Sequence, residues 1–136
     1  MIFEIAIQRI VIDKKSGNDK MVKELYFVNN VELFAEAELK GLELYTNNAD
    51  VIAVRISAIR EFVNARTSDE QSIFVATIED VITSEDGDEK VMKYKVALFA
   101  KDIHDATRIT SEYMRMGISD MSLVGIKRTK FIDILS

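Results

Sequence analysis

The sequence of 136 residues predicts an α+β fold, and three features carry this prediction. Apolar and polar side chains alternate at the beginning of each half of the chain, as they do in strands with one buried face. Each half then places apolar residues at helical spacing, over residues 31–45 and 102–116. These patterns follow one another in the same order in both halves, which indicates an internal duplication.

The duplication is visible in matching residues at a nearly constant offset. Ile2-Phe3 corresponds to Ile73-Phe74 at an offset of 71. One residue is absorbed in the next turn, and later matches share an offset of 70: Gly17 with Gly87, Leu33 with Ile103, Leu39 with Ile109, Val54 with Val124 and Ile56 with Ile126. We expect one domain, residues 1–136, divided into a first repeat at 1–63, a connector at 64–71 and a second repeat at 72–136.

The first repeat is expected to begin with a β-hairpin. Alternation over residues 3–7 is followed by a polar turn at 14–19, and alternation resumes at 25–27. Asn29-Asn30 then offers caps for a helix over 31–45.

The second repeat shows the same order of elements. Strands near 72–83 and 90–99 flank the acidic turn Ser84–Glu89. The helix over 102–116 starts at Asp102, with Asp105 three residues later in an arrangement typical of a helix N-terminus.

Each repeat is expected to end in a third strand. Residues 46–50 break the first helix, and residues 51–63 then follow a strand pattern. Gly117 ends the second helix, before a long strand over 121–135. Because three strands and one helix leave much apolar surface bare, the two ββαβ repeats should share one pseudo-symmetric antiparallel sheet or one core, with one helix per repeat.

Composition narrows the classes of function. The chain has no cysteine, which excludes disulfide frameworks, zinc ribbons, iron–sulfur clusters and cysteine nucleophiles, and its single histidine is His104. Phosphate-binding loops, dinucleotide fingerprints and nucleophile elbows are absent from the sequence. The acidic loop at 85–89 suits a solvated hairpin tip better than a calcium site. We therefore expect no enzymatic activity, no cofactor and no metal.

The charge is unevenly distributed along the chain. The net charge is −5, yet residues 90–136 carry nine basic and five acidic side chains. The cationic candidates lie on the second helix and the last strand: His104, Arg108, Arg115, Lys127, Arg128 and Lys130. These side chains could contact the phosphates of a single-stranded nucleic acid. The alternative is a solvated helix face with scattered charges.

The first helix carries apolar residues on two sides. Its expected core face consists of Leu33, Phe34, Ala37, Gly41, Leu44 and Tyr45. On the opposite side, where a solvent-facing helix should be polar, stand Ala35, Leu39 and Leu42. This second stripe needs a partner: either the other half of the same chain buries it, or it is an oligomer interface.

The order of motifs resembles a known family. The first hairpin leads through Tyr26-Phe27-Val28-Asn29 into Phe34-Ala35-Glu36-Ala37-Glu38, and the chain closes on the strand from Ile126 to Ile134. These segments are similar to those of small proteins from Bacteroidetes and their phages, the family called domain of unknown function 4494. The resemblance covers nearly the whole chain. It implies the doubled plan and a phage or mobile-element origin, and it assigns no activity.

Two hypotheses about function follow. The first is a non-catalytic protein-interaction or assembly module of phage or mobile-element type, which binds itself as a homo-oligomer or binds another protein. The second is a single-stranded nucleic-acid-binding protein that uses the basic C-terminal face. Exposure of Tyr26, Tyr94 and Phe131 would favour nucleic acid, because bases stack on exposed rings, and burial would favour assembly. No apolar run is long enough for a membrane span, so we expect a cytoplasmic protein of a bacterial host, free or associated with a virion.

Overall fold

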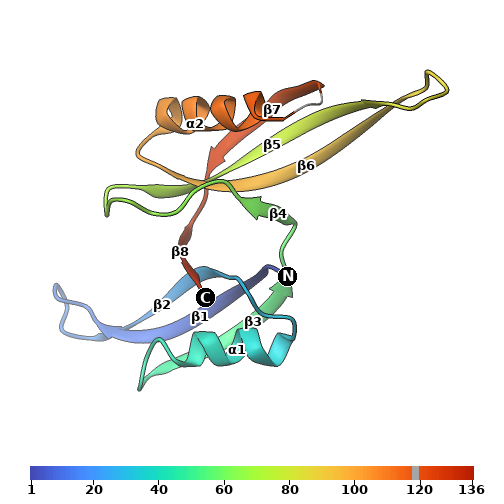
Figure 1. The fold of residues 1–136 in the computed structure, drawn as a ribbon. Coiled ribbons are helices and arrows are strands. Elements are labelled where there is room, and N and C mark those ends of the chain that lie inside the picture. Colours follow the sequence, from blue (N-terminus) through green and yellow to red (C-terminus); the bar gives the residue numbers. More distant parts are fainter. Residues whose placement is uncertain (118–119) are drawn as a thin grey trace. The chain divides into compact units, whose positions relative to one another are not determined.

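The computed structural model describes residues 1–117 and 120–136, and its architecture is α+β as expected (Figure 1). The described residues form two helices and two four-stranded mixed sheets. The elements in chain order are β1 (Phe3–Ile12), β2 (Asp19–Val28), α1 (Phe34–Leu42), β3 (Ala49–Ile56), β4 (Ile59–Phe62), β5 (Ser72–Thr83), β6 (Glu89–Ala100), α2 (Ile103–Arg115), β7 (Asp120–Arg128) and β8 (Phe131–Leu135).

The chain divides into two compact units. Unit 1 consists of Met1–Ser57 and Lys130–Ser136, and unit 2 consists of Ala58–Thr129. Each unit holds an antiparallel hairpin, a helix and a third strand antiparallel to the first strand of its hairpin. The acidic loop forms the tip of the hairpin in unit 2, where Gly87 has a φ of +84° that favours glycine.

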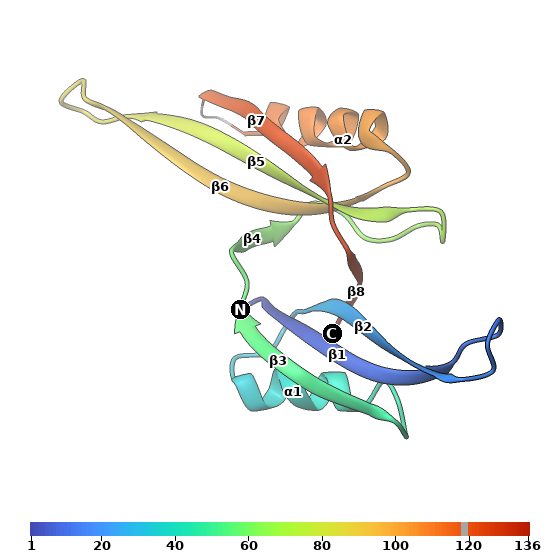
Figure 2. The ribbon, with the colours of Figure 1, turned by 180° about the vertical axis from the view of Figure 1, so that it is seen from behind.

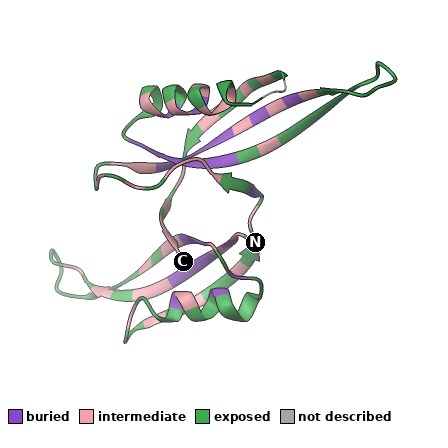
Figure 3. Ribbon diagram, in the orientation of Figure 1, coloured by how far each residue is buried: buried purple, intermediate pink, exposed green. Residues whose placement is uncertain are grey.

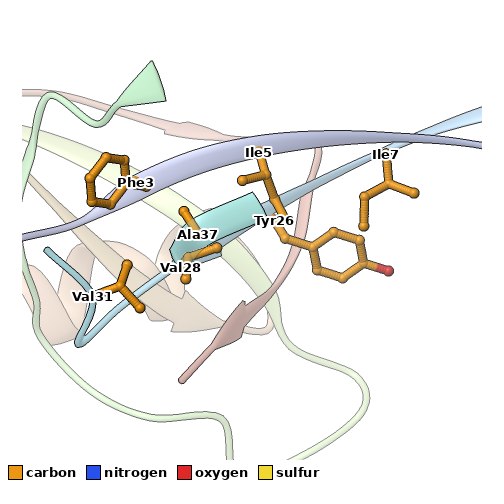
Figure 4. Close-up of a cluster of buried hydrophobic side chains, with 7 residues drawn as sticks. All are labelled: Phe3, Ile5, Ile7, Tyr26, Val28, Val31 and Ala37. Carbon is orange, nitrogen blue, oxygen red and sulfur yellow. The ribbon is translucent and has the colours of Figure 1, made fainter. Parts of the chain in front are cut away.

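The sheet of unit 1 has the strand order β3-β1-β2-β8, and α1 packs against β3 and β1. Alternate residues of β1 and β2 face the helix and meet Ala37 in the core. Figure 4 shows this cluster: Phe3, Ile5, Ile7, Tyr26, Val28, Val31 and Ala37. The helix lies close to the sheet: a Cβ at Gly41 would stand only 2.8 Å from side-chain atoms of both Ile5 and Val51.

The sheet of unit 2 has the strand order β4-β6-β5-β7, and α2 packs against β6 and β7 (Figure 2). Its core is built in the same way from alternate strand residues and one alanine of the helix: Phe74, Ala76, Ile78, Val96, Leu98, Ala100 and Ala106. The helix position that corresponds to Gly41 is held by Thr110, which is fully buried and donates its hydroxyl to the Ala106 carbonyl at 2.8 Å.

The expected third strands are wrong in one respect. Residues 51–63 and 121–135 each form two strands, separated by the pairs Ser57-Ala58 and Thr129-Lys130. The second strand of each segment lies in the sheet of the other unit, parallel to its neighbour: β4 pairs with β6, and β8 pairs with β2. One shared antiparallel sheet is therefore replaced by two mixed sheets. Side-chain periodicity does not reveal which neighbour a strand chooses, and so could not show this change of sheet.

The expected helix cap at Asn29-Asn30 is also wrong. Asn30 has a φ of +63° and lies in a bend before the helix. The N-cap position of α1 is Leu33, whose side chain cannot accept a hydrogen bond. In α2 the expected cap is confirmed, because the Asp102 carboxylate accepts a hydrogen bond from the Asp105 backbone N–H at 2.8 Å. A polar residue before an apolar run can serve a turn as well as a cap.

Candidate functional site

The outer side of α1 is the first candidate site. Ala37 and Gly41 are the buried residues of this helix. At about 100° per residue, Ala35, Leu39 and Leu42 lie within a sector of roughly 60° on the side away from the sheet. All three are exposed, Leu39 by 57% and Leu42 by 47%. We call these three residues the α1 apolar stripe, and Figure 3 shows the exposed outer side of the helix.

The buried face of α1 is narrower than the core face predicted from the sequence. Leu33, Phe34 and Leu44 are exposed, although they were expected in the core. The phenyl ring of Phe34 packs edge-to-face against Phe3, with centroids 5.1 Å apart. The close approach of the helix at Gly41 leaves room only for small side chains between helix and sheet. Leu33 is the N-cap residue and Leu44 follows the C-cap Glu43, so both lie beyond the ends of α1.

The corresponding side of α2 is polar. The buried pairs are Ala37 and Gly41 in α1, and Ala106 and Thr110 in α2, so the helices correspond at an offset of 69. The offset of 70 that matched Leu39 with Ile109 in the sequence is therefore wrong by one residue for the helices. The offset of 69 carries the α1 apolar stripe onto His104, Arg108 and Ser111. Two helices in the same position of the same plan thus present different outer faces.

The candidate basic residues are distributed over α2, β7 and the residues Thr129-Lys130 before β8. Arg108 donates hydrogen bonds to Asp105 at 2.7 Å and to Glu112 at 3.1 Å, and these partners raise the pKa of Arg108. Lys127 and Arg128 are successive residues of β7 and point to opposite sides of the sheet, where Arg128 lies over the Phe74 ring at 5.5 Å. His104 and Arg115 are exposed on α2, while Lys130 belongs to unit 1.

The aromatic residues that could stack on bases are engaged elsewhere. Tyr26 is buried in the core of unit 1. Tyr94 packs against the core of unit 2 and carries the Arg60 guanidinium over its ring at 4.5 Å. Phe131 stacks on Phe27, with centroids 3.9 Å apart. Of these three rings, Tyr26 is buried, whereas Tyr94 and Phe131 are half-buried.

The structure contains a groove in unit 2 that was not predicted from the sequence. It encloses about 760 Å³ between α2 on one side and β4 with the segment after it on the other. Its lining includes Phe62, Val63, Ile109, Tyr113 and Met116. The pattern over 51–63 predicted one continuous strand, so no sequence signal placed residues 61–64 beside this helix.

Two side chains of the groove, Tyr113 and Arg108, bind carboxylate partners. The Tyr113 hydroxyl donates a hydrogen bond to the Glu61 carboxylate. Burial, together with this bond, raises the pKa of Tyr113, so the phenol stays protonated at neutral pH. Arg108 lies at the groove between its two carboxylate partners. The groove thus combines apolar side chains with the ion pairs of Arg108, and Lys101 also lines it.

Unit 1 holds a second polar cluster, centred on Glu24. Its carboxylate accepts hydrogen bonds from Tyr26 at 3.1 Å, Tyr45 at 2.5 Å and Arg9 at 3.1 Å. Burial alone would raise the pKa of Glu24, but the bonds from Tyr45, Arg9 and Tyr26 outweigh it and hold that pKa below its ordinary value. Burial is also the main cause that raises the pKa of Tyr26. Every member of the cluster has a partner, which is typical of a structural network.

These features define a two-unit α+β protein whose helices carry unlike outer faces. The chain belongs to the family described as Domain of unknown function (DUF4494), whose model matches residues 2–136, and the resemblance seen in the sequence is confirmed. No curated protein and no solved structure matches the chain. Neither described helix is long and apolar enough to cross a membrane.

Proposed function

We propose that this protein is a non-catalytic interaction module that assembles with further copies of itself through the α1 apolar stripe. The exposure of Leu39 and Leu42, on the side of α1 opposite its own sheet, carries the proposal. Full burial of a leucine side chain is worth about 1.5–3 kcal/mol, so covering both would favour association.

The second helix strengthens this argument. At the positions equivalent to the stripe, α2 carries His104, Arg108 and Ser111, as expected for a helix face in contact with water. The plan of the fold therefore does not require apolar residues at these positions. Their presence in α1 is best explained by a partner surface, and a stripe of three small and medium apolar residues suits the same stripe on a second copy.

The test is to place a charge in the stripe. Leu39→Glu and Leu42→Glu should each convert an oligomeric wild-type protein to a monomer, because an unpaired charge in an apolar interface costs several kcal/mol. Light scattering coupled to size exclusion measures the mass, and circular dichroism checks that the fold is kept. Thr107→Glu, which adds the same charge at an exposed position of α2, serves as the control and should leave the mass unchanged.

Two results would count against the proposal. A wild-type protein that stays monomeric up to high concentration would remove the interface. If Leu39→Glu unfolds the protein rather than dissociating it, the stripe is part of the fold and not a surface for a second copy.

A further inference from the structure

Both units complete their sheets with a strand that follows the other unit's third strand. The chain leaves unit 1 after β3 and forms β4 in the sheet of unit 2. It leaves unit 2 after β7 and forms β8 in the sheet of unit 1. The two sheets thus exchange their fourth strands reciprocally.

The two crossing points are built alike. Each spans two residues, and the first of them carries a hydroxyl: Ser57 and Thr129. The Ser57 N–H donates to the Ile2 carbonyl at 2.9 Å, and the Thr129 N–H donates to the Ile73 carbonyl at 2.9 Å. In each repeat the chain is therefore hydrogen-bonded to its own unit as far as the crossing point, and the next strand pairs in the other sheet.

β8 lies at the edge of the sheet of unit 1, beside β2. Its backbone pairs in parallel with β2 over Leu25–Val28, and the Asn29 N–H donates to the Leu135 carbonyl at 2.8 Å. Phe131 stacks on Phe27, and Leu135 packs against the core of unit 1. These contacts would be the same whether β8 came from the same chain or from another copy.

We propose that the strand-accepting edge of β2 also receives β8 from a second copy of this chain, so that copies join by strand exchange. β8 makes the same contacts whether it comes from the same chain or from a second copy, so the ratio of monomer to strand-exchanged oligomer depends on protein concentration. A short tether presents its own strand at an effective concentration in the millimolar range, which favours exchange within one chain in dilute solution. Short hinges such as Thr129-Lys130 make exchange between chains accessible when copies fold together at high concentration. This inference does not depend on the α1 apolar stripe.

The absence of cysteine from the chain allows a direct test. One copy carries Leu25→Cys and a differently tagged copy carries Phe131→Cys, because these residues are paired between β2 and β8. Both copies also carry Leu39→Glu, which removes association through α1. The two copies are unfolded, refolded together at about 0.5 mM, near the effective concentration of the tether, and then oxidised. We expect a disulfide-linked band that contains both tags and that weakens on refolding at tenfold dilution.

A control pair of cysteine variants measures how often disulfides form between copies by random collision. Gln8→Cys and Lys23→Cys, placed on separate copies, are paired within the β1–β2 hairpin, which does not cross between units. A linked band no stronger than this control would overturn the proposal, provided that a single copy with both Leu25→Cys and Phe131→Cys closes its own disulfide.

A hinge variant tests the same idea without cysteine. Inserting four Gly and Ser residues between Thr129 and Lys130 relaxes the crossing and should lower the fraction of refolded dimer in the Leu39→Glu background. An unchanged dimer fraction, or no dimer with either hinge at 0.5 mM, would contradict strand exchange.

Discussion

Units 1 and 2 share one order of elements but differ in how the helix meets the sheet and in what the helix shows to solvent. In unit 1 the contact is made by Ala37 and Gly41, and the outer side carries the apolar stripe. In unit 2 the contact is made by Ala106 and Thr110, and the outer side is polar. The inner faces of the helices are constrained by packing, whereas the outer faces are free to diverge and are the natural place for a function particular to one unit.

The shared plan extends to a local irregularity of the sheets. The pairing of β1 with β3 shifts register between Ala6 and Ile7, and that of β5 with β7 shifts between Thr77 and Ile78. These positions correspond at the offset of 71 found in the sequence. A bulge bends its strand and breaks the regular ladder of an edge, so both units protect the same edge in the same way.

The largest effects are expected from the equivalent core phenylalanines. Phe3→Ala and Phe74→Ala each remove a fully buried ring and should lower the free energy of unfolding by about 3–5 kcal/mol. Urea denaturation followed by circular dichroism measures both. A loss below about 1 kcal/mol in one unit would break the equivalence of the two cores.

The close helix contact of unit 1 is tested by Gly41→Thr, which introduces the residue found at the equivalent position of unit 2. The new Cβ would stand 2.8 Å from Ile5 and Val51, so we expect a loss of about 1–3 kcal/mol on urea denaturation. Gly125→Ala is the control, because no described atom lies within 4 Å of a Cβ there. A neutral Gly41→Thr would show that α1 can move away from the sheet without loss.

The helix caps should respond in opposite directions. Asp102→Ala removes the bond to the Asp105 N–H and should cost about 1 kcal/mol of stability. Leu33→Asp supplies α1 with the acceptor that it lacks and should add up to about 1 kcal/mol. Thermal melting of both variants gives the comparison. If both changes destabilise, Leu33 is held by packing and not by the lack of a cap.

The smallest effect is expected from the Glu24 cluster of unit 1. Unit 2 has no such carboxylate, because Tyr94 occupies the position equivalent to Glu24. The folded-state pKa of Glu24 lies below the ordinary 4.5, so its carboxylate stabilises the fold above pH 4.5. That contribution is lost as the pH falls through the folded pKa. Urea midpoints between pH 7 and pH 3 should therefore fall less steeply for Glu24→Gln than for the wild type. Parallel curves would mean that the cluster does not distinguish the folded state from the unfolded one.

Local patterns in the sequence determined the class of fold, the two hairpins, the two helices and the repeated order of elements. Strand alternation and helical spacing arise from backbone geometry within a few residues, and they survive any choice of neighbour. The cap at Asp102 was predictable for the same reason, since donor and acceptor lie three residues apart.

Tertiary structure decided what depends on distant partners. Residues 51–63 and 121–135 kept strand character, but only the pairing of β4 with β6 and of β8 with β2 divides them between two sheets. The groove beside Tyr113 exists because β4 crosses to unit 2. The α1 apolar stripe was visible as a pattern, while its exposure followed from the position of Gly41 against Ile5. Strand pairing and helix packing join residues far apart in the chain, and periodicity along the chain carries no information about which of them meet.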